Sequence, residues 1–126
     1  MIEKKFTSRE YVCSIAGITN IFANLPCLVA EERFDTLLDA GSVRIERIVS
    51  TGQVTPADTW YDQNWDEWIL VLSGSAVLML EGNPEPHRLT AGDCLLLPAH
   101  QRHRVEWTAP DERTVWLAVH IGEQQQ

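Results

Sequence analysis

The sequence predicts an all-β domain folded as a sandwich or a barrel. Short apolar segments recur from residue 43 onward, and turn residues separate them at intervals of about 8–12 residues. Segments such as 103–107 alternate polar and apolar residues, which is typical of a strand with one buried face. The length of 126 residues fits one domain with one core. We therefore predict a single domain over residues 20–126, preceded by an extension over residues 1–19.

The first element of this domain is predicted to be a short helix over residues 31–41. Phe34, Leu37 and Leu38 are spaced i, i+3 and i+4, so they would form one apolar face. Two glutamates at the start of the segment would interact favourably with the helix dipole. Gly41 at its end is a suitable C-terminal cap.

Strands are expected from residue 43 almost to the C-terminus. Pro56 confines segment 55–61 to an edge or irregular strand, because proline has no N–H to donate to a neighbour. In the first strand the alternation slips at Arg47, where a bulge would fit. The regular strands are predicted over residues 43–49, 67–73, 76–80, 87–90, 94–97, 103–107 and 114–121.

Composition and charge exclude several classes of partner. The net charge of −8 argues against binding to nucleic acid, whose phosphates require a basic surface. No apolar stretch approaches the ~20 residues that span a membrane, and no signal-peptide pattern follows the N-terminus, so we expect no membrane partner. Three cysteines without paired or metal-ligand spacing favour a reducing compartment, and we expect a cytoplasmic protein.

One segment in the C-terminal half carries a spaced set of glycine, proline and histidine. Gly92, Pro98 and His103 fall on the pattern Gly-(x)5-Pro-x-Gly-(x)2-His-(x)3-Asn, and this segment resembles the second motif of the cupin family. His100 stands where the second glycine is usual, and Trp107 stands where the asparagine is usual.

The first cupin motif, His-x-His-(x)3 or 4-Glu-(x)6-Gly, is matched only in its second half. Glu67 and Gly74 occupy the glutamate and glycine positions. The two histidine positions are taken, depending on the spacing, by Tyr61 and Gln63 or by Trp60 and Asp62. The resemblance covers residues 43–121, and the chain is similar to small single-domain bacterial cupins with a degenerate first motif.

The resemblance implies a cupin-type jelly-roll barrel, also called a double-stranded β-helix, with a small-molecule site in its mouth. It also implies a homodimer, in which residues 1–19 could add a strand to the partner subunit or exchange with one. The alternative for these residues is a mobile extension, as termini often are. The resemblance supplies a fold and a site position but no substrate.

Glu67 and His103 are the two polar residues that we expect to meet inside the barrel. In the cupin family, histidines and a glutamate at these motif positions hold a divalent metal, and Zn, Fe, Mn or Ni would be suitable here. One hypothesis is that Gln63, Glu67 and His103 bind the metal, with Tyr61 or Asp62 completing the set. Amide and carboxylate oxygens with one imidazole would make a harder and weaker site than the usual one.

Two further hypotheses remain open for this site. In one, His100 or His120 replaces a missing histidine ligand. In the other there is no metal, and Glu67 and His103 hydrogen-bond to each other or to a ligand. His103, Glu67 and Tyr61 are then the candidate catalytic residues, with the imidazole and the carboxyl group acting as general base and acid.

Aromatic residues gather around the two half-motifs. Tryptophans 60, 65, 68, 107 and 116 either pack the core and rim or line a pocket for a small organic ligand. The candidate ligand-binding residues are Trp60, Asp62, Trp107 and His120. We therefore predict a cupin that binds a small molecule, either as an enzyme acting on an organic substrate or as a non-catalytic binding protein or dimeric scaffold.

Overall fold

The computed structural model describes residues 17–122. This part of the chain contains eight β-strands and no helix, so it contains none that is long and apolar enough to cross a membrane. Residues 1–16, which make up most of the predicted N-terminal extension, lie outside the described residues. The strands are β1 (Arg33–Asp39), β2 (Val43–Ser50), β3 (Asp66–Ser73), β4 (Ser75–Leu80), β5 (Asn83–Thr90), β6 (Cys94–Leu97), β7 (His103–Thr108) and β8 (Thr114–Ile121).

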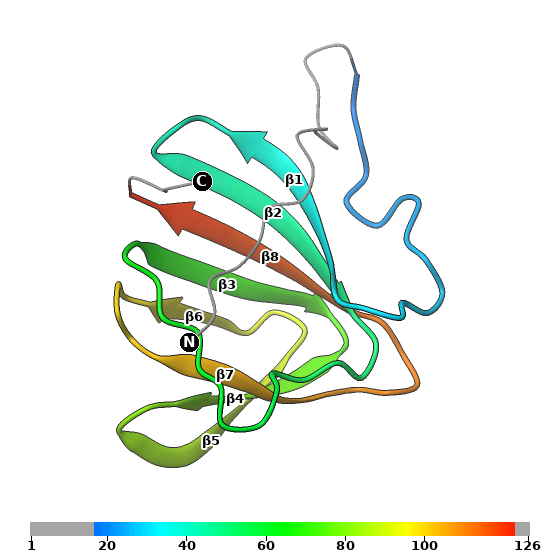
Figure 1. The fold of residues 1–126 in the computed structure, drawn as a ribbon. Coiled ribbons are helices and arrows are strands. Elements are labelled where there is room, and N and C mark those ends of the chain that lie inside the picture. Colours follow the sequence, from blue (N-terminus) through cyan, green and yellow to red (C-terminus); the bar gives the residue numbers. More distant parts are fainter. Residues whose placement is uncertain (1–16, 123–126) are drawn as a thin grey trace.

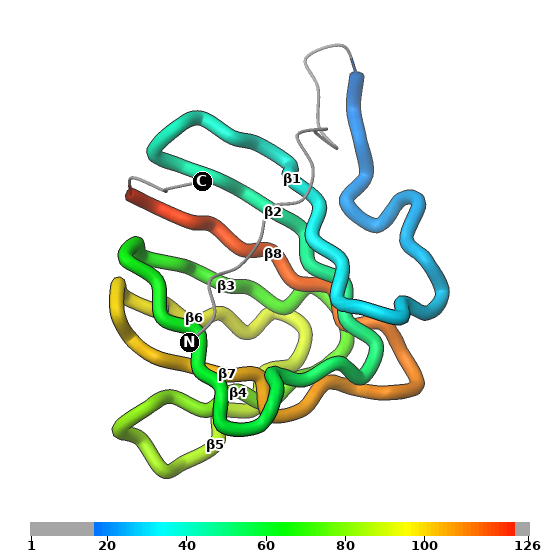
Figure 2. The backbone as a smooth tube through the Cα atoms, in the orientation of Figure 1, coloured from blue at the N-terminus to red at the C-terminus, as the bar shows by residue number. Residues whose placement is uncertain are grey.

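The strands form two antiparallel sheets that face each other. The larger sheet has the order β1-β2-β8-β3-β6, and the smaller sheet has the order β5-β4-β7. Figure 1 shows the smaller sheet below the larger one, and Figure 2 shows the chain crossing between the two. Strands that are distant in sequence, such as β2 and β8, are therefore neighbours. This arrangement is the predicted jelly-roll architecture.

The core lies between the sheets because each strand turns alternate side chains inward. The larger sheet contributes Ile48, Ile69 and Trp116, and the smaller sheet contributes Leu78 and Leu89. All five are at least 96% buried. The alternation that predicted strands from residue 43 onward is thus the pattern of core-facing residues.

The predicted helix over residues 31–41 is wrong, because residues 33–39 form strand β1, paired with β2. A register shift between Thr36 and Leu38 inserts one extra residue into β1. That bulge turns a two-residue periodicity into the i, i+3, i+4 spacing of a helix. Gly41 has a φ of 78°, as the capping argument required, but it serves the β1–β2 hairpin.

The strand predictions from residue 43 hold, with three differences. β2 pairs with β8 without interruption through Arg47, so the bulge predicted there lies in β1 instead. β5 begins at Asn83 and includes two prolines, which it tolerates as an edge strand. Segment 55–61 forms no strand, and only Tyr61 pairs with His103, in an isolated bridge.

Replacing Gly74 with alanine is expected to destabilise the fold strongly. Gly74 joins β3 to β4 at a φ of 84°, and a Cβ atom there would lie 2.5 Å from the Thr114 Cα and 2.6 Å from the Arg113 carbonyl oxygen. We expect a loss of about 2–4 kcal/mol of unfolding free energy in urea titrations. The neighbouring backbone must shift to make room for the Cβ atom, and the alanine itself must adopt a strained φ.

The matched control for this variant is Gly82→Ala. Gly82 has nearly the same φ, 88°, but nothing lies within 4 Å of its would-be Cβ. This variant should lose only about 1 kcal/mol of unfolding free energy, because backbone strain is its only cost. Equal losses for the two variants would show that the contact with β8 is unimportant.

Candidate functional site

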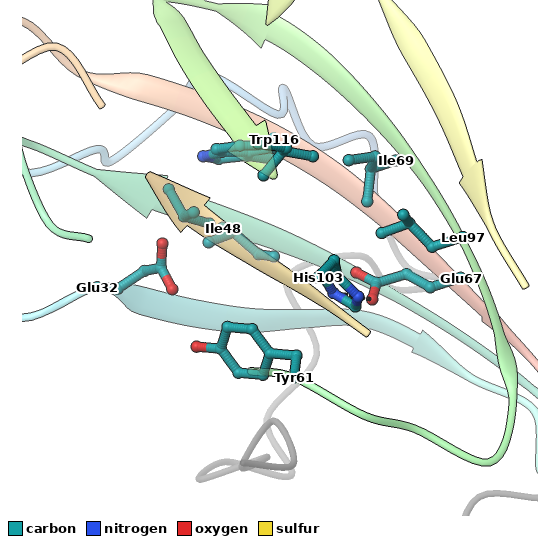
Figure 3. A pocket seen from close by; sticks show the side chains of 10 residues that line it. Glu32, Ile48, Tyr61, Glu67, Ile69, Leu97, His103 and Trp116 are labelled. Atoms are coloured by element: carbon teal, nitrogen blue, oxygen red, sulfur yellow. Dashed lines mark ion pairs between the residues drawn. The ribbon is translucent and has the colours of Figure 1, made fainter. Parts of the chain in front are cut away.

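A pocket opens between the two sheets, as Figure 3 shows. Its cavity volume is about 20 Å³, which is room for one small group, and the pocket is partly open to solvent. Most of the lining is apolar, and the polar side chains are few, which is typical of small-molecule sites. The apolar lining residues are Ile48, Ile69, Leu78, Leu97, Val105 and Trp116, and the polar ones are Glu32, Tyr61, Glu67 and His103.

Glu67 and His103 meet in this pocket from opposite sheets. Glu67 is the second residue of β3 and His103 is the first residue of β7, and both are at least 96% buried. The Nε2 atom of His103 lies 3.9 Å from the Oε1 atom of Glu67 (Figure 3). This distance is that of a charge pair with room between the groups rather than of a direct hydrogen bond.

The imidazole of His103 is oriented by the backbone. Its Nδ1 atom lies 3.0 Å from the carbonyl oxygen of Gln101. Because a carbonyl oxygen only accepts hydrogen bonds, Nδ1 must carry the hydrogen. In the neutral ring the basic lone pair is therefore on Nε2, the nitrogen that faces Glu67.

Gln63 joins the pair, as the first metal hypothesis required. Its Nε2 atom donates a 3.1 Å hydrogen bond to Oε1 of Glu67, and its side chain is buried. The Oε1 atom of Gln63 is buried without a hydrogen-bond partner among residues 17–122. Gln63, Glu67 and His103 thus offer one amide, one carboxylate and one imidazole.

This donor set does not fit a tightly held divalent metal. Within the described part of the chain, no group of three or more histidine, cysteine, aspartate or glutamate side chains is close enough to hold a metal ion. The carboxylate of Glu67 already accepts an amide N–H, and an amide oxygen is a weak ligand beside the imidazoles that Zn, Fe and Ni prefer.

His100 lies outside the pocket. Its side chain is 69% exposed, and its Nδ1 atom lies 2.9 Å from Oδ1 of Asp62. The backbone φ of His100 is 64°, in the left-handed region. Glycine adopts this region without strain, which explains why a glycine is usual at this position of the motif.

His120 faces the barrel interior, but both of its ring nitrogens are already engaged. The indole N–H of Trp65 donates to Nδ1 over 2.8 Å, and Nε2 lies 2.7 Å from Oε1 of Glu46. Since indole only donates, Nδ1 must be the acceptor and Nε2 must carry the hydrogen. His120 and Glu46 are completely buried, so this network is a structural connection between β2, β8 and the loop before β3.

Sequence reasoning did not find Glu46 or the role of Trp65. The available signal was the alternation of β2, which places Glu46 on the same face as the core residue Ile48. A carboxylate on a core-facing position requires a partner. The partner could not be identified without knowing that β8 pairs with β2.

Of the three aromatic candidates, Tyr61 lines the pocket, and Trp60 and Trp107 do not. The Tyr61 ring stacks on His103 with centroids 5.6 Å apart, and Figure 3 shows its hydroxyl directed away from the nitrogens of His103. Trp60 packs with two arginine side chains at 6.0 Å and is not among the lining residues. Trp107 is 36% exposed beneath Arg88 and is also not a lining residue.

Glu32 is a pocket residue that sequence reasoning missed, because segment 31–41 was assigned to a helix. The indole N–H of Trp116 donates to the Ser50 hydroxyl over 3.2 Å, and that hydroxyl donates to Oε2 of Glu32 over 2.7 Å. This chain of hydrogen bonds fixes a second carboxylate at the pocket. A neighbouring outer cleft shares Glu32, Tyr61 and Val105 with the pocket, so the two spaces adjoin.

Together, the two facing sheets and the pocket between them define a small jelly-roll barrel. The family model described as the Cupin domain matches residues 47–120, which is more than half of the chain. The chain therefore belongs to the cupin superfamily, as the two half-motifs predicted.

Solved structures agree with this assignment. A protein from Ralstonia eutropha JMP134, provisionally assigned as a mannose-6-phosphate isomerase, is 47% identical, with a TM-score of 0.82 over 84% of this chain and 98% of its own. A cupin superfamily protein from Desulfitobacterium hafniense DCB-2 is 19% identical, with a TM-score of 0.65 over 79% and 84% of the two chains. The polyketide cyclase RemF from Streptomyces resistomycificus is 22% identical, with a TM-score of 0.65 over 77% and 69%. The last two share only the fold, and no curated protein matches the chain.

Proposed function

We propose that this cupin is an enzyme that moves a proton between adjacent carbons of a small carbonyl compound. The observation that supports this most is the buried pair of His103 and Glu67 at a largely apolar pocket, 3.9 Å apart on facing sheets. A basic nitrogen beside a carboxylate, held away from bulk water, is a suitable general base.

The proposed reaction uses His103 as the base that removes and returns the proton. Nε2 removes a proton from a carbon next to a carbonyl group, and the resulting imidazolium is stabilised by the Glu67 carboxylate. That carbon carries a hydroxyl group, and the proton of this hydroxyl passes to the oxygen of the former carbonyl group. The imidazolium then returns its proton to the neighbouring carbon. The product is an isomer of the substrate, and neither an oxidant nor a reductant is needed.

The similar structure from Ralstonia eutropha supports this class of reaction, since it is provisionally assigned as an isomerase and shares 47% of its residues. The pocket carries two carboxylates, Glu32 and Glu67, and no described lysine or arginine lines it. We therefore expect an uncharged hydroxycarbonyl compound to be a better substrate than a sugar phosphate. Its reacting carbon would enter the pocket, and the rest of the molecule would lie in the adjoining outer cleft.

Proton exchange in D2O tests this function even before the substrate is identified. Glyceraldehyde, dihydroxyacetone, mannose, fructose and mannose 6-phosphate would each be incubated with the protein and followed by NMR. We expect deuterium incorporation next to the carbonyl of at least one uncharged compound, faster than without protein. Stabilisation by a compound without any exchange would instead favour the non-catalytic binding function, and exchange only with mannose 6-phosphate would contradict the predicted charge preference.

Metal removal is expected to leave the protein unchanged. Because the donor set of Gln63, Glu67 and His103 is a poor one for a divalent ion, we expect far less than one equivalent of metal per chain in elemental analysis. Chelator should leave the melting temperature unchanged, since only a bound metal would stabilise the fold by mass action. One equivalent of Zn, Fe, Mn or Ni, with a fall in melting temperature on chelation, would restore the metal hypothesis.

A further inference from the structure

The site has a second polar end, on the side of the pocket that meets the outer cleft. Glu32 lies directly before β1 and lines both spaces, as does Tyr61. Figure 3 shows the Glu32 carboxylate and the Tyr61 hydroxyl on the opposite side of His103 from Glu67. A ligand whose reacting carbon lies at His103 would therefore pass Glu32 where it extends into the outer cleft.

The orientation of the Glu32 carboxylate is set by the core. Arg33 pairs with Val49, so the strand register places Glu32 beside Ser50. Ser50 is completely buried, and its hydroxyl accepts the Trp116 indole N–H, so its single hydrogen is available for Oε2 of Glu32. A hydroxyl donor orients the carboxylate without neutralising its negative charge.

The surroundings of this carboxylate favour a positively charged group. The outer cleft has a volume of about 300 Å³, which is at the lower end of the range for small-molecule sites. Its lining includes the carboxylates of Glu31 and Glu32 and the aromatic rings of Phe34 and Tyr61, and no described lysine or arginine lines either space. Carboxylates attract an ammonium group, and the faces of aromatic rings add a cation–π attraction. An anionic group such as a phosphate would be repelled.

We propose that this end of the site binds a primary ammonium group of the substrate and that Glu32 is the residue that selects it. The inference rests on the proposed function, since it concerns the part of a hydroxycarbonyl substrate that lies away from the reacting carbon. The ammonium group donates to Glu32 at the border of the two spaces, where the protein walls exclude part of the water and strengthen the attraction. Affinity should then fall in the order cationic, uncharged, anionic.

A purely structural role for Glu32 predicts a different result. If Glu32 served only to accept the hydrogen bond of Ser50, a glutamine oxygen would accept it as well, and the ligand preference would not change. Glu32→Gln separates the two roles, because it keeps the acceptor and removes the charge.

The test compares three sugars that share one skeleton and differ in charge: 6-amino-6-deoxymannose, mannose and mannose 6-phosphate. Their dissociation constants would be measured by NMR titration at pH 7, where an alkyl amine is protonated. We expect the amino sugar to bind at least tenfold more tightly than mannose, and mannose 6-phosphate to bind more weakly than mannose. The compound 6-acetamido-6-deoxymannose keeps the nitrogen but not the charge, so it should bind like mannose.

Glu32→Gln should bring the affinities for the amino sugar and for mannose to within about twofold of each other. The ranking of the four sugars on the wild-type protein tests the proposal even if this variant is unstable. Glu31→Gln removes the neighbouring charge of the outer cleft and should reduce the preference less than Glu32→Gln does. Glu85→Gln is the matched control, since it makes the same change on β5 of the smaller sheet, outside both spaces, and it should leave the preference unchanged.

Mannose that binds as tightly as the amino sugar would overturn the proposal, and so would a preference that survives in Glu32→Gln or is lost equally in Glu85→Gln. Binding and proton exchange, measured separately, distinguish this inference from the proposed function. A preference for the amino sugar without deuterium exchange would support the ammonium site and contradict the isomerase reaction. Exchange with mannose but no such preference would support the reaction and contradict the ammonium site.

Discussion

Replacing His103 with alanine is expected to abolish the proton exchange that the wild-type protein catalyses. Without the imidazole the pocket has no base whose lone pair is fixed by a backbone contact. General-base catalysis by a positioned side chain contributes about 10²–10⁴-fold, so we expect the exchange rate to fall by at least a hundredfold. Glu67→Gln keeps the size of the side chain but removes the charge that stabilises the imidazolium, and it should lower the rate by at least tenfold.

His100→Ala is the control for the His103 variant. The two imidazoles are three residues apart, but that of His100 lies outside the pocket beside Asp62. This control should exchange protons at the wild-type rate. Melting temperatures of all three variants would show whether a lost rate reflects a lost fold. If His103→Ala and Glu67→Gln are folded and retain the wild-type rate, the assignment of the site is wrong.

Replacing His120 with alanine is expected to cause the largest loss of stability. The change leaves the Glu46 carboxylate and the Trp65 indole N–H buried without their partner. A buried polar group left without its hydrogen-bond partner costs about 1–3 kcal/mol, more for a carboxylate, and the cavity adds to the cost of these two groups. Since many domains have only about 5–15 kcal/mol of stability, the variant should be largely unfolded at low denaturant.

Two further variants separate this network from a general effect of losing a histidine. His120→Gln supplies an amide N–H for Glu46 together with an oxygen that can accept from Trp65, so it should recover part of the loss. His87→Ala removes a partly exposed histidine on the edge strand β5, which hydrogen-bonds to Asn83, and it should change stability by no more than about 0.5 kcal/mol. Urea unfolding measures all three. Similar stabilities for His120→Ala and His87→Ala would show that the buried network contributes little.

The strands from Val43 onward could be predicted because their alternation reflects a single buried face. β1 could not be predicted, because its bulge at Leu37 imitates helical spacing in a short window. Local periodicity does not distinguish a bulged strand from one turn and a half of helix. The pairing of β1 with β2 determines that this segment is a strand. The sequence pattern of β1 alone does not reveal that pairing.

The proximity of Glu67 and His103 could be predicted from two half-motifs, because the fold brings them together from facing sheets. The contacts of the other buried polar residues could not be predicted in the same way. His120 is a candidate ligand-binding residue in the sequence, but its bonds to Trp65 and Glu46 depend on strand order. Trp107 is predicted as a ligand contact, and its contact with Arg88 is one that the sequence pattern does not reveal.

The most direct test of the proposed site is a crystal structure of the protein grown with the hydroxycarbonyl compound that exchanges fastest. We expect the compound between the two sheets, with the carbon that loses its proton nearest to Nε2 of His103 and the adjacent oxygens within reach of the polar groups of the pocket. A compound bound on the outer surface, or one bound in the pocket with its reacting carbon turned away from His103 and Glu67, would contradict the proposed mechanism.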